Sequence, residues 1–565
     1  MDEERRDDHP AWPLRAAILA LLGVVFGFLF SRLIEGLESG AATGQPARAA
    51  AAAFVAVSGI VFALTLERSR WRWSALFAAA CGLVAGFVAG WNGHPREWGA
   101  GEGWQFFSAL LAVAFAVPIF QSVRDGGRRR PDTRLVHVHV WTDLTLAGAA
   151  AAFVGATLLL TVLLAQLFHL IGIDLLRDIL DESAFMVPLA CGAFGGAVGL
   201  LRDRDQVLGT LHKAGRAVLS VLAPILALGL ALFVAALPFT GLQPLWDQTE
   251  ATTPILLACL VGAILLVNAV IGNAVDEEAG STVLRGAAVL LALVMAPLAF
   301  VAAVSTAKRI DQYGLTPDRL WACVFVLAAA AFALAYLYAA VRGRSGWPEA
   351  LRRANVRLAA GLCLLALVLA LPIVSFGALS ASDQLARLES GRVSPERFDW
   401  AAMRFDFGPS GRRALERLAA AGRADLRVYA SRTLSAEGRF ALAEQAEAAR
   451  PKPPLKLSVD GAAAVPDALR LALEREGRCF DRPCRLLFAG PERAVVISGG
   501  CPDCSTNALL LDRLPSGEWG VRTESAPTLP ATGEPAPLER RKVEVRTVER
   551  RQVFVDGEPV GPEFD

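Results

Sequence analysis

The sequence predicts an all-α polytopic membrane helix bundle of about 11 transmembrane helices, followed by a small soluble α+β C-terminal domain. Three observations predict this fold. The 565-residue chain is 54% hydrophobic and nearly neutral, which gives no basic surface for nucleic acid. Apolar runs of about 20 residues, enough to cross a bilayer core of roughly 30 Å, recur up to Phe376 and none follows it. Beyond Phe376, helical periodicity and then short alternating segments appear.

Eleven apolar segments have the length of a transmembrane helix. They are 14–34, 49–66, 73–91, 104–120, 146–171, 184–201, 217–239, 254–274, 283–304, 320–341 and 358–376. Indole rings prefer the headgroup depth of a bilayer, so tryptophans near segment ends support these boundaries. The tryptophans in such positions are Trp12, Trp73, Trp91, Trp104, Trp141, Trp246 and Trp321.

Arginine and lysine are unevenly divided between the connections. The N-terminus and every second connection hold about 21 of them, and the intervening connections hold about 6. Short loops rich in these residues stay in the cytoplasm, so we expect a cytoplasmic N-terminus. Eleven spans then place the C-terminus on the exported side.

The chain divides into three regions. Residues 1–377 form the transmembrane helix bundle, and residues 378–450 form a helical neck that is interrupted at 408–411. Residues 451–565 form a β-rich domain with four cysteines, in which strands are expected at 485–489, 493–498, 508–514 and 519–522 and in a last pair around Arg550 and Arg551.

The four cysteines of the β-rich domain are Cys479, Cys484, Cys501 and Cys504. Their pattern, C-x4-C and C-x2-C separated by sixteen residues, fits the spacing of a zinc ribbon. An exported domain folds where thiols are oxidised, so disulfides are the expectation there, with three connectivities open. A cytoplasmic domain would favour zinc instead. A catalytic thiol at Cys501 is a further alternative, although no long helix follows Cys504 to lower the thiol pKa.

Polar side chains inside the segments are candidates for a site. His169, Asn268 and Asn273 lie at or near membrane depth, where such groups usually face a bundle interior or a cavity. They can equally bond between helices as structural groups. No segment carries a carboxylate or lysine near its centre, which disfavours an ion-coupled transporter.

His137 and His139 lie in the stretch 135–143, which alternates polar and apolar residues and is expected to be extended, as a surface or interfacial loop. No third or fourth ligand follows nearby, so we assign no metal site. No Walker A, H-E-x-x-H, G-x-S-x-G or Rossmann motif is present. We therefore expect no cofactor, assign no catalytic residue and do not expect an enzyme.

From about His137 onward the chain resembles bacterial multipass proteins of the domain-of-unknown-function family 4153. The resemblance rests on "HVHVWTDLTLAG", "LFHLIGIDLLRDIL", "FMVPLACGAFGGAVGLLRDR" and "RFDWAAMRFDFGPSGRRALERLA". It covers half to two thirds of the chain and implies a bacterial inner-membrane protein of unassigned activity. It supplies no mechanism. The arginine and lysine distribution, not the resemblance, places the neck and the C-terminal domain in the periplasm.

These observations lead to a functional expectation. We expect a polytopic inner-membrane protein whose exported C-terminal domain binds or senses an envelope component, with the lipid bilayer and an envelope protein or cell-wall ligand as partners. Two alternatives remain open at this point. One is a transporter or lipid-handling protein with a midplane polar site, and the other is a membrane-tethered thiol oxidoreductase.

Overall fold

The computed structural model of the chain describes residues 12, 14–38, 45–127, 129–248, 251–449, 455–459, 464–476, 479–480, 484–498, 507–521, 551–555 and 558–564. The chain forms two compact units, Met1–Leu442 and Ala443–Asp565. The first unit is helical, and the second contains the sheet.

Eleven helices of the first unit are long and apolar enough to cross a membrane. They are α1 (Arg15–Glu38), α2 (Gln45–Thr65), α3 (Trp71–Asn92), α4 (Ala100–Gly126), α5 (Thr133–Leu170), α7 (Ser183–Arg202), α8 (Asp205–Thr240), α10 (Thr252–Ile271), α11 (Thr282–Tyr313), α12 (Pro317–Arg342) and α13 (Trp347–Ala370). Short helices lie between them, namely α6 (Leu175–Leu180), α9 (Gln243–Gln248), η1 (Pro95–Glu97), η2 (Val275–Glu277) and η3 (Arg344–Gly346). The predicted fold class, a polytopic bundle followed by a small sheet, is confirmed.

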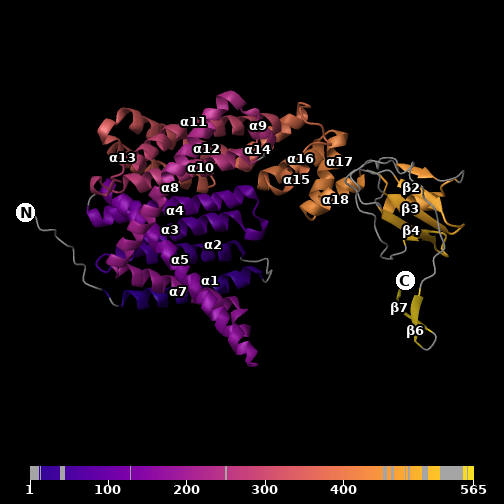
Figure 1. The fold of residues 1–565 in the computed structure, drawn as a ribbon, viewed down its shortest axis with the longest axis horizontal. Coiled ribbons are helices and arrows are strands. Elements are labelled where there is room, and N and C mark those ends of the chain that lie inside the picture. The colour runs from indigo at the N-terminus through magenta and orange to yellow at the C-terminus, as the bar shows by residue number, and fades with distance from the viewer. Residues whose placement is uncertain are drawn as a thin grey trace, which may run out of the picture. The chain divides into compact units, whose positions relative to one another are not determined.

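The long helices pack in two groups within the bundle (Figure 1). Helices α1, α2, α3 and α7 form one group, and α8, α10, α11 and α12 surround a second core that includes Leu260, Leu291 and Met295. Helices α4 and α13 pack against each other, and the hydroxyl of Ser108 on α4 donates to the carbonyl of Ala366 on α13 at 2.9 Å. Residues far apart in the sequence therefore meet at the centre of the bundle.

Helix α5 begins well before the predicted fifth segment. The carboxylate of Asp132 accepts hydrogen bonds from the backbone N–H groups of Arg134 and Leu135, which fixes the start of the helix. The prediction of an extended stretch at 135–143 is wrong, because buried positions there follow the spacing of a helix rather than that of a strand. Helix α5 has 38 residues and runs obliquely to α1 and α7 (Figure 1).

Five further helices complete the helical part: α14 (Phe376–Glu389), α15 (Trp400–Phe405), α16 (Gly408–Ala421), α17 (Ala424–Ser435) and α18 (Arg439–Ala449). They have their own core, which includes Leu388, Met403 and Leu415. Most of this stretch, up to Leu442, belongs to the same compact unit as the bundle.

The second unit contains a five-stranded sheet in the order β1-β2-β3-β4-β5. Its strands are β1 (Leu457–Val459), β2 (Cys484–Phe488), β3 (Arg493–Ser498), β4 (Asn507–Arg513) and β5 (Trp519–Val521), and α19 (Asp467–Arg475) packs on them. Strand β1 is parallel to β2, and the other neighbours are antiparallel. A separate antiparallel pair consists of β6 (Arg551–Val555) and β7 (Glu558–Phe564).

Candidate functional site

Charged side chains gather at the end of the bundle where α1 begins and α2 ends, which we call the arginine-rich end. Arg15 of α1 pairs with Glu67, just after α2, at 3.3 Å and with Asp203, just after α7, at 3.4 Å. The guanidinium group of Arg15 is mostly buried. Three helices are therefore joined at this end by ion pairs that are largely shielded from solvent.

The last carbonyl groups of α2 accept hydrogen bonds from long side chains of other helices. The donors are Gln121 and Arg124 of α4 and Arg202 of α7. Helix C-termini carry unpaired carbonyl groups and partial negative charge, so arginine is favourable there. These contacts fix α2, α4 and α7 relative to one another around a charged layer.

Two side chains of α5 enter this charged layer. His139 and Asp143 are four residues apart and so share one face of the helix. His139 Nε2 lies 3.3 Å from a carboxylate oxygen of Asp125, and the Gln121 side chain donates to Asp143 Oδ1 at 3.2 Å. The other oxygen of Asp143, Oδ2, is buried and has no hydrogen-bond partner among the residues that the structure describes.

The cluster contains three side chains that can gain or lose a proton. Asp125, His139 and Asp143 are titratable groups at one end of a mostly apolar bundle, and ionisable residues within membrane helices commonly mark ion or proton pathways. Arg124 and Arg202 interact electrostatically with Asp143. The Oδ2 of Asp143, which is unpartnered among the described residues, can accept a proton.

Two sequence stretches that carry the family resemblance meet in this cluster. "HVHVWTDLTLAG" supplies His139 and Asp143, and "FMVPLACGAFGGAVGLLRDR" supplies Arg202 and Asp203. Sequence reasoning missed Asp143, because the stretch 135–143 was expected to be an extended surface or interfacial loop. The spacing of four residues between His139 and Asp143 is the signal that could have identified it.

Asn268 forms a second buried polar network. Its amide nitrogen donates to the hydroxyl of Tyr336 at 2.7 Å, and its amide oxygen accepts from the side chain of Asn355 at 2.8 Å. Tyr336 is fully buried. The network joins α10, α12 and α13, which is the interhelical bonding expected of a structural amide.

Asn273 and Arg352 lie close to the C-terminal end of α10. Arg352 is almost fully buried and donates to the carbonyl of Ile271 at 2.9 Å and to Glu278 at 3.0 Å. The backbone N–H of Asn273 donates to Glu277 Oε2 at 3.2 Å. Asn273 Oδ1 is buried and has no partner in the described part of the chain.

His169 lies apart from the two asparagines. It is at the C-terminal end of α5, where its side chain pairs with Asp174 and both are about half exposed. His137, at the start of the same helix, interacts electrostatically with Arg352 and is about 48 Å from His169 along the helix. The structure therefore does not bring His169 together with Asn268 and Asn273.

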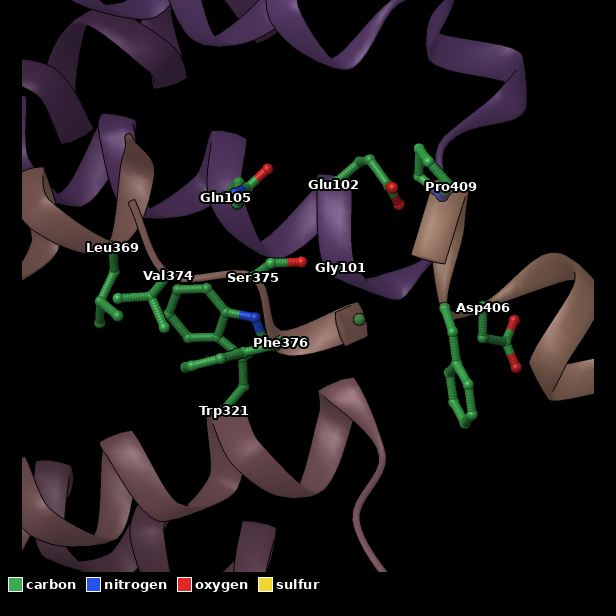
Figure 2. A pocket seen from close by; sticks show the side chains of 12 residues that line it. Gly101, Glu102, Gln105, Trp321, Leu369, Val374, Ser375, Phe376, Asp406 and Pro409 are labelled. Carbon is green, nitrogen blue, oxygen red and sulfur yellow. The ribbon is translucent and has the colours of Figure 1, made fainter. Parts of the chain in front are cut away.

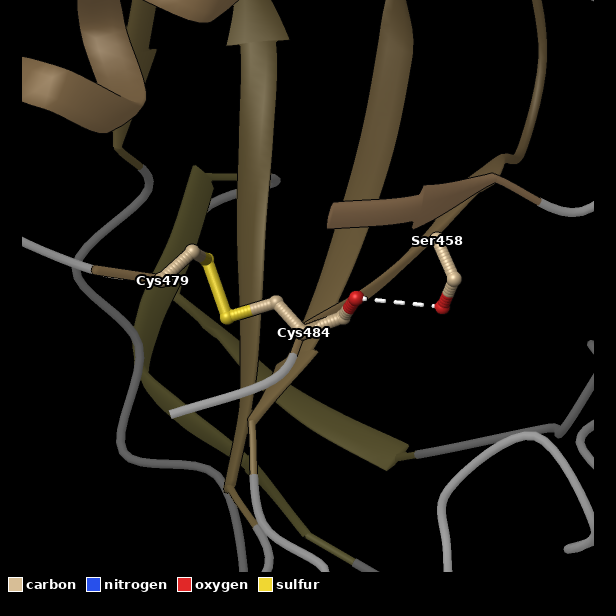
Figure 3. Close-up of a disulfide and its surroundings, with 3 residues drawn as sticks. All are labelled: Ser458, Cys479 and Cys484. Atoms are coloured by element: carbon tan, nitrogen blue, oxygen red, sulfur yellow. Dashed lines mark hydrogen bonds between the residues drawn. A yellow bond between two sulfur atoms is a disulfide. The ribbon is translucent and has the colours of Figure 1, made fainter. Parts of the chain in front are cut away.

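Cys479 and Cys484 form a disulfide in the second unit (Figure 3). Both are buried, and Cys484 begins β2. The backbone of Lys456 bonds to both cysteines, and the hydroxyl of Ser458 donates to the carbonyl of Cys484 at 3.2 Å. Cys479 has a positive φ of 67°, a backbone conformation that residues with a side chain seldom adopt. The cross-link thus ties the chain before β2 to the first residue of β2, which is the second strand of the sheet.

The other seven cysteines fall into two groups. Cys501 and Cys504 lie outside the described residues. The five cysteines of the helical unit are free thiols in the structure: Cys81, Cys191, Cys259, Cys323 and Cys363. Among the described residues, no group of three or more His, Cys, Asp or Glu side chains could hold a metal ion.

Comparisons with known proteins identify the helical unit. No curated protein and no solved structure matches the chain. The family described as "Domain of unknown function (DUF4153)" matches residues 16–418. This range begins earlier than the resemblance at His137, starts one residue after Arg15, covers the rest of the eleven long helices and stops within α16. Because the match covers more than half of the chain, this membrane protein belongs to the DUF4153 family.

Proposed function

We propose that the chain is a multipass protein of the bacterial inner membrane whose exported face binds or senses a component of the cell envelope. The N-terminus is cytoplasmic, and the helices after α13 and the disulfide-containing unit lie in the periplasm. The uneven distribution of arginine and lysine supports this orientation.

The observation that carries the proposal is the attachment of α14 to the bundle. Gln384 donates to the carbonyl of Tyr313 at 2.8 Å, and Arg387 donates to the carbonyl of Gln312 at 2.8 Å. The carboxylate of Asp383 accepts from the backbone N–H of Leu315 at 2.7 Å. These bonds join α14 to the C-terminal end of α11, so a change in the extramembrane helices reaches the membrane helices directly.

The first test is the side of the membrane on which the C-terminus lies. We expect an alkaline phosphatase fused after Asp565 to be active, because that enzyme folds where disulfides form, and a fluorescent reporter at the same place to stay dark. Thiols are alkylated in intact cells before lysis and counted with and without reduction. Reduction should reveal at least two additional thiols, those of Cys479 and Cys484. A different result would be a bright fluorescent fusion, with the thiols of Cys479 and Cys484 reacting without reduction. It would overturn the proposed orientation and favour a zinc site at the four cysteines.

A second candidate function is favoured by the cluster of the arginine-rich end. Asp143 places a buried carboxylate in a long membrane helix beside His139 and Asp125, which is the kind of group that a proton-linked transporter or lipid-handling protein requires. The absence of such a group from the segment centres was the sequence argument against transport. That argument still holds for the segment centres, because Asp143 lies near the start of α5, so the second candidate rests on the cluster at the arginine-rich end alone.

Proteoliposomes containing a pH-sensitive dye test this second candidate. We expect Asp143→Asn to lower the rate of proton movement by about 100-fold, because the amide cannot carry a proton between its neighbours. His169→Ala and Asp174→Asn change an exposed pair at the far end of α5 and should leave the rate unchanged. A wild-type rate in Asp143→Asn would exclude the cluster as a proton pathway.

A further inference from the structure

A small cavity lies at the end of the bundle opposite the arginine-rich end (Figure 2). It is formed where the start of α4, the start of α12 and the end of α13 meet the segment from α14 to α16. Its volume is about 60 Å³. The side chains that matter for its chemistry are Glu102, Gln105, Trp321, Ser375, Phe376 and Phe407.

The local sequence builds one wall of this cavity from α4. Glu102 is in the first turn of α4, where its Oε2 accepts a hydrogen bond from the backbone N–H of Gly99 at 3.1 Å. Gly408 has a φ of +57°, and a Cβ added to it would lie 2.6 Å from Glu102 Oε1. Glycine is favoured at this first position of α16 because of its positive φ, and it leaves room for the carboxylate.

An unpaired hydrogen-bond donor forms the opposite wall. Trp321 is 3% exposed, and its indole Nε1–H has no hydrogen-bond partner among the residues that the structure describes. Figure 2 shows the nitrogen on the edge of the ring that faces Ser375. Trp104 stacks on Trp321 and Phe376 meets its ring edge-on, so the indole is held in place. A buried donor without a partner indicates that an acceptor is supplied from elsewhere.

The two carboxylates at the cavity differ in charge balance. Asp406 forms an ion pair with Arg439. Glu102 is half-buried and has no cationic partner in the described part of the chain. A partly buried carboxylate is stabilised by a nearby cation, so Glu102 is the group in this cavity that would attract one. The aromatic side chains of Trp321, Phe376 and Phe407 line the cavity, and aromatic rings favour an organic cation over a hydrated metal ion.

The size of the cavity limits the ligand. A volume of about 60 Å³ admits roughly four to six groups of the size of water, at about 10–15 Å³ each. A two-carbon amino alcohol, with one nitrogen, two carbons and one oxygen, has the right number of atoms.

We propose that this cavity binds an ethanolamine-type group. Its ammonium group donates to Glu102, its oxygen accepts from Trp321 Nε1, and its two carbons lie against the aromatic rings. The group can come from a free amino alcohol or from the headgroup of an aminophospholipid at the same membrane depth. This inference deepens the proposed function by naming a ligand class, and it rests on that function only for the side of the membrane that the cavity faces.

Binding to the full-length protein tests the proposal. In detergent without added lipid, calorimetric titration should show saturable binding of ethanolamine or phosphoethanolamine. Glu102→Gln keeps the shape and the acceptor for Gly99 but removes the charge, so we expect affinity to fall about tenfold or more. Trp321→Phe removes only the N–H donor and should weaken binding several-fold. Glu389→Gln and Trp73→Phe change exposed residues outside the cavity and should bind as the wild type does.

Nanodiscs separate the two sources of the ligand. Mass spectrometry after purification shows which lipid stays bound. If phosphatidylethanolamine is retained over phosphatidylglycerol, and Glu102→Gln abolishes this preference, the ligand is the lipid headgroup. Binding of the soluble amines without such retention would identify the free compound. The proposal is overturned if neither amine nor aminophospholipid binds, or if Glu102→Gln binds as the wild type does. If the fusion after Asp565 reports a cytoplasmic C-terminus and the amine still binds, the proposed orientation is overturned. The assignment of the ligand to the cavity is then supported.

Discussion

Arg352→Ala is expected to destabilise the protein by about 3–5 kcal/mol, because it leaves the partly buried carboxylate of Glu278 and the buried carbonyl of Ile271 without their partner. The Arg352 side chain is 1% exposed and contacts Glu278 at 3.0 Å, Glu349 at 3.2 Å and the carbonyl of Ile271 at 2.9 Å. The free energy of unfolding, or the midpoint of thermal unfolding in detergent, measures the effect.

The neighbouring arginine provides the control. Arg353 is 58% exposed and lies 3.8 Å from Glu349. Exposed ion pairs contribute little, so Arg353→Ala should change stability by about 0.5 kcal/mol or less. Arg352→Lys restores the charge but not the three separate contacts of the planar guanidinium group, and it should recover only part of the loss. Equal stabilities of Arg352→Ala and Arg353→Ala would show that the buried contacts carry no net energy.

The long helices were predictable from local sequence. A membrane selects apolar runs of a certain length, and each run is visible without knowledge of its neighbours. The start of α5 was not predictable in this way. The stretch around His137 and His139 alternates like a strand, whereas Asp132 caps a helix there and Trp141 and Leu146 are buried against other helices. Tertiary burial outweighed the local pattern.

The candidate site was only partly predictable, because its contacts join distant residues. Asn268 was identified from its depth, but its partners Tyr336 and Asn355 are 68 and 87 residues away. Asp143 was missed, since its contact with Gln121 depends on how α4 packs against α5. The cavity beside Trp321 was also missed, because it exists only where the segment from α14 to α16 folds back on the start of α4.

The family match indicates which part of the chain carries the features that the family shares. It contains both the charged cluster and the residues that line the cavity, and it ends at residue 418, before the second unit begins. Features that the family has in common therefore belong to the bundle and to α14–α16. The disulfide-containing unit lies outside the matched range.

The packing of α1 on α7 should be among the most sensitive contacts of the bundle. Gly195 lets the two helices approach so closely that an added Cβ would lie 2.2 Å from the carbonyl oxygen of Leu19. Small residues at such crossings allow membrane helices to pack by direct backbone contact. We expect Gly195→Ala to force α1 away from α7 and to cost about 3 kcal/mol, at the upper end of the usual range for overpacking.

Gly196 is the matched control for this prediction. A Cβ added there would lie 3.4 Å from the Cβ of Ala20, which is an ordinary van der Waals contact. Gly196→Ala removes a flexible residue from the same helix without a clash, so it should be neutral or stabilising by up to about 1 kcal/mol. Thermal unfolding of both variants, together with cross-linking between cysteines placed on α1 and α7, separates a displaced helix from a general loss of stability. If both variants unfold like the wild type, the close approach of α1 and α7 does not hold the bundle together.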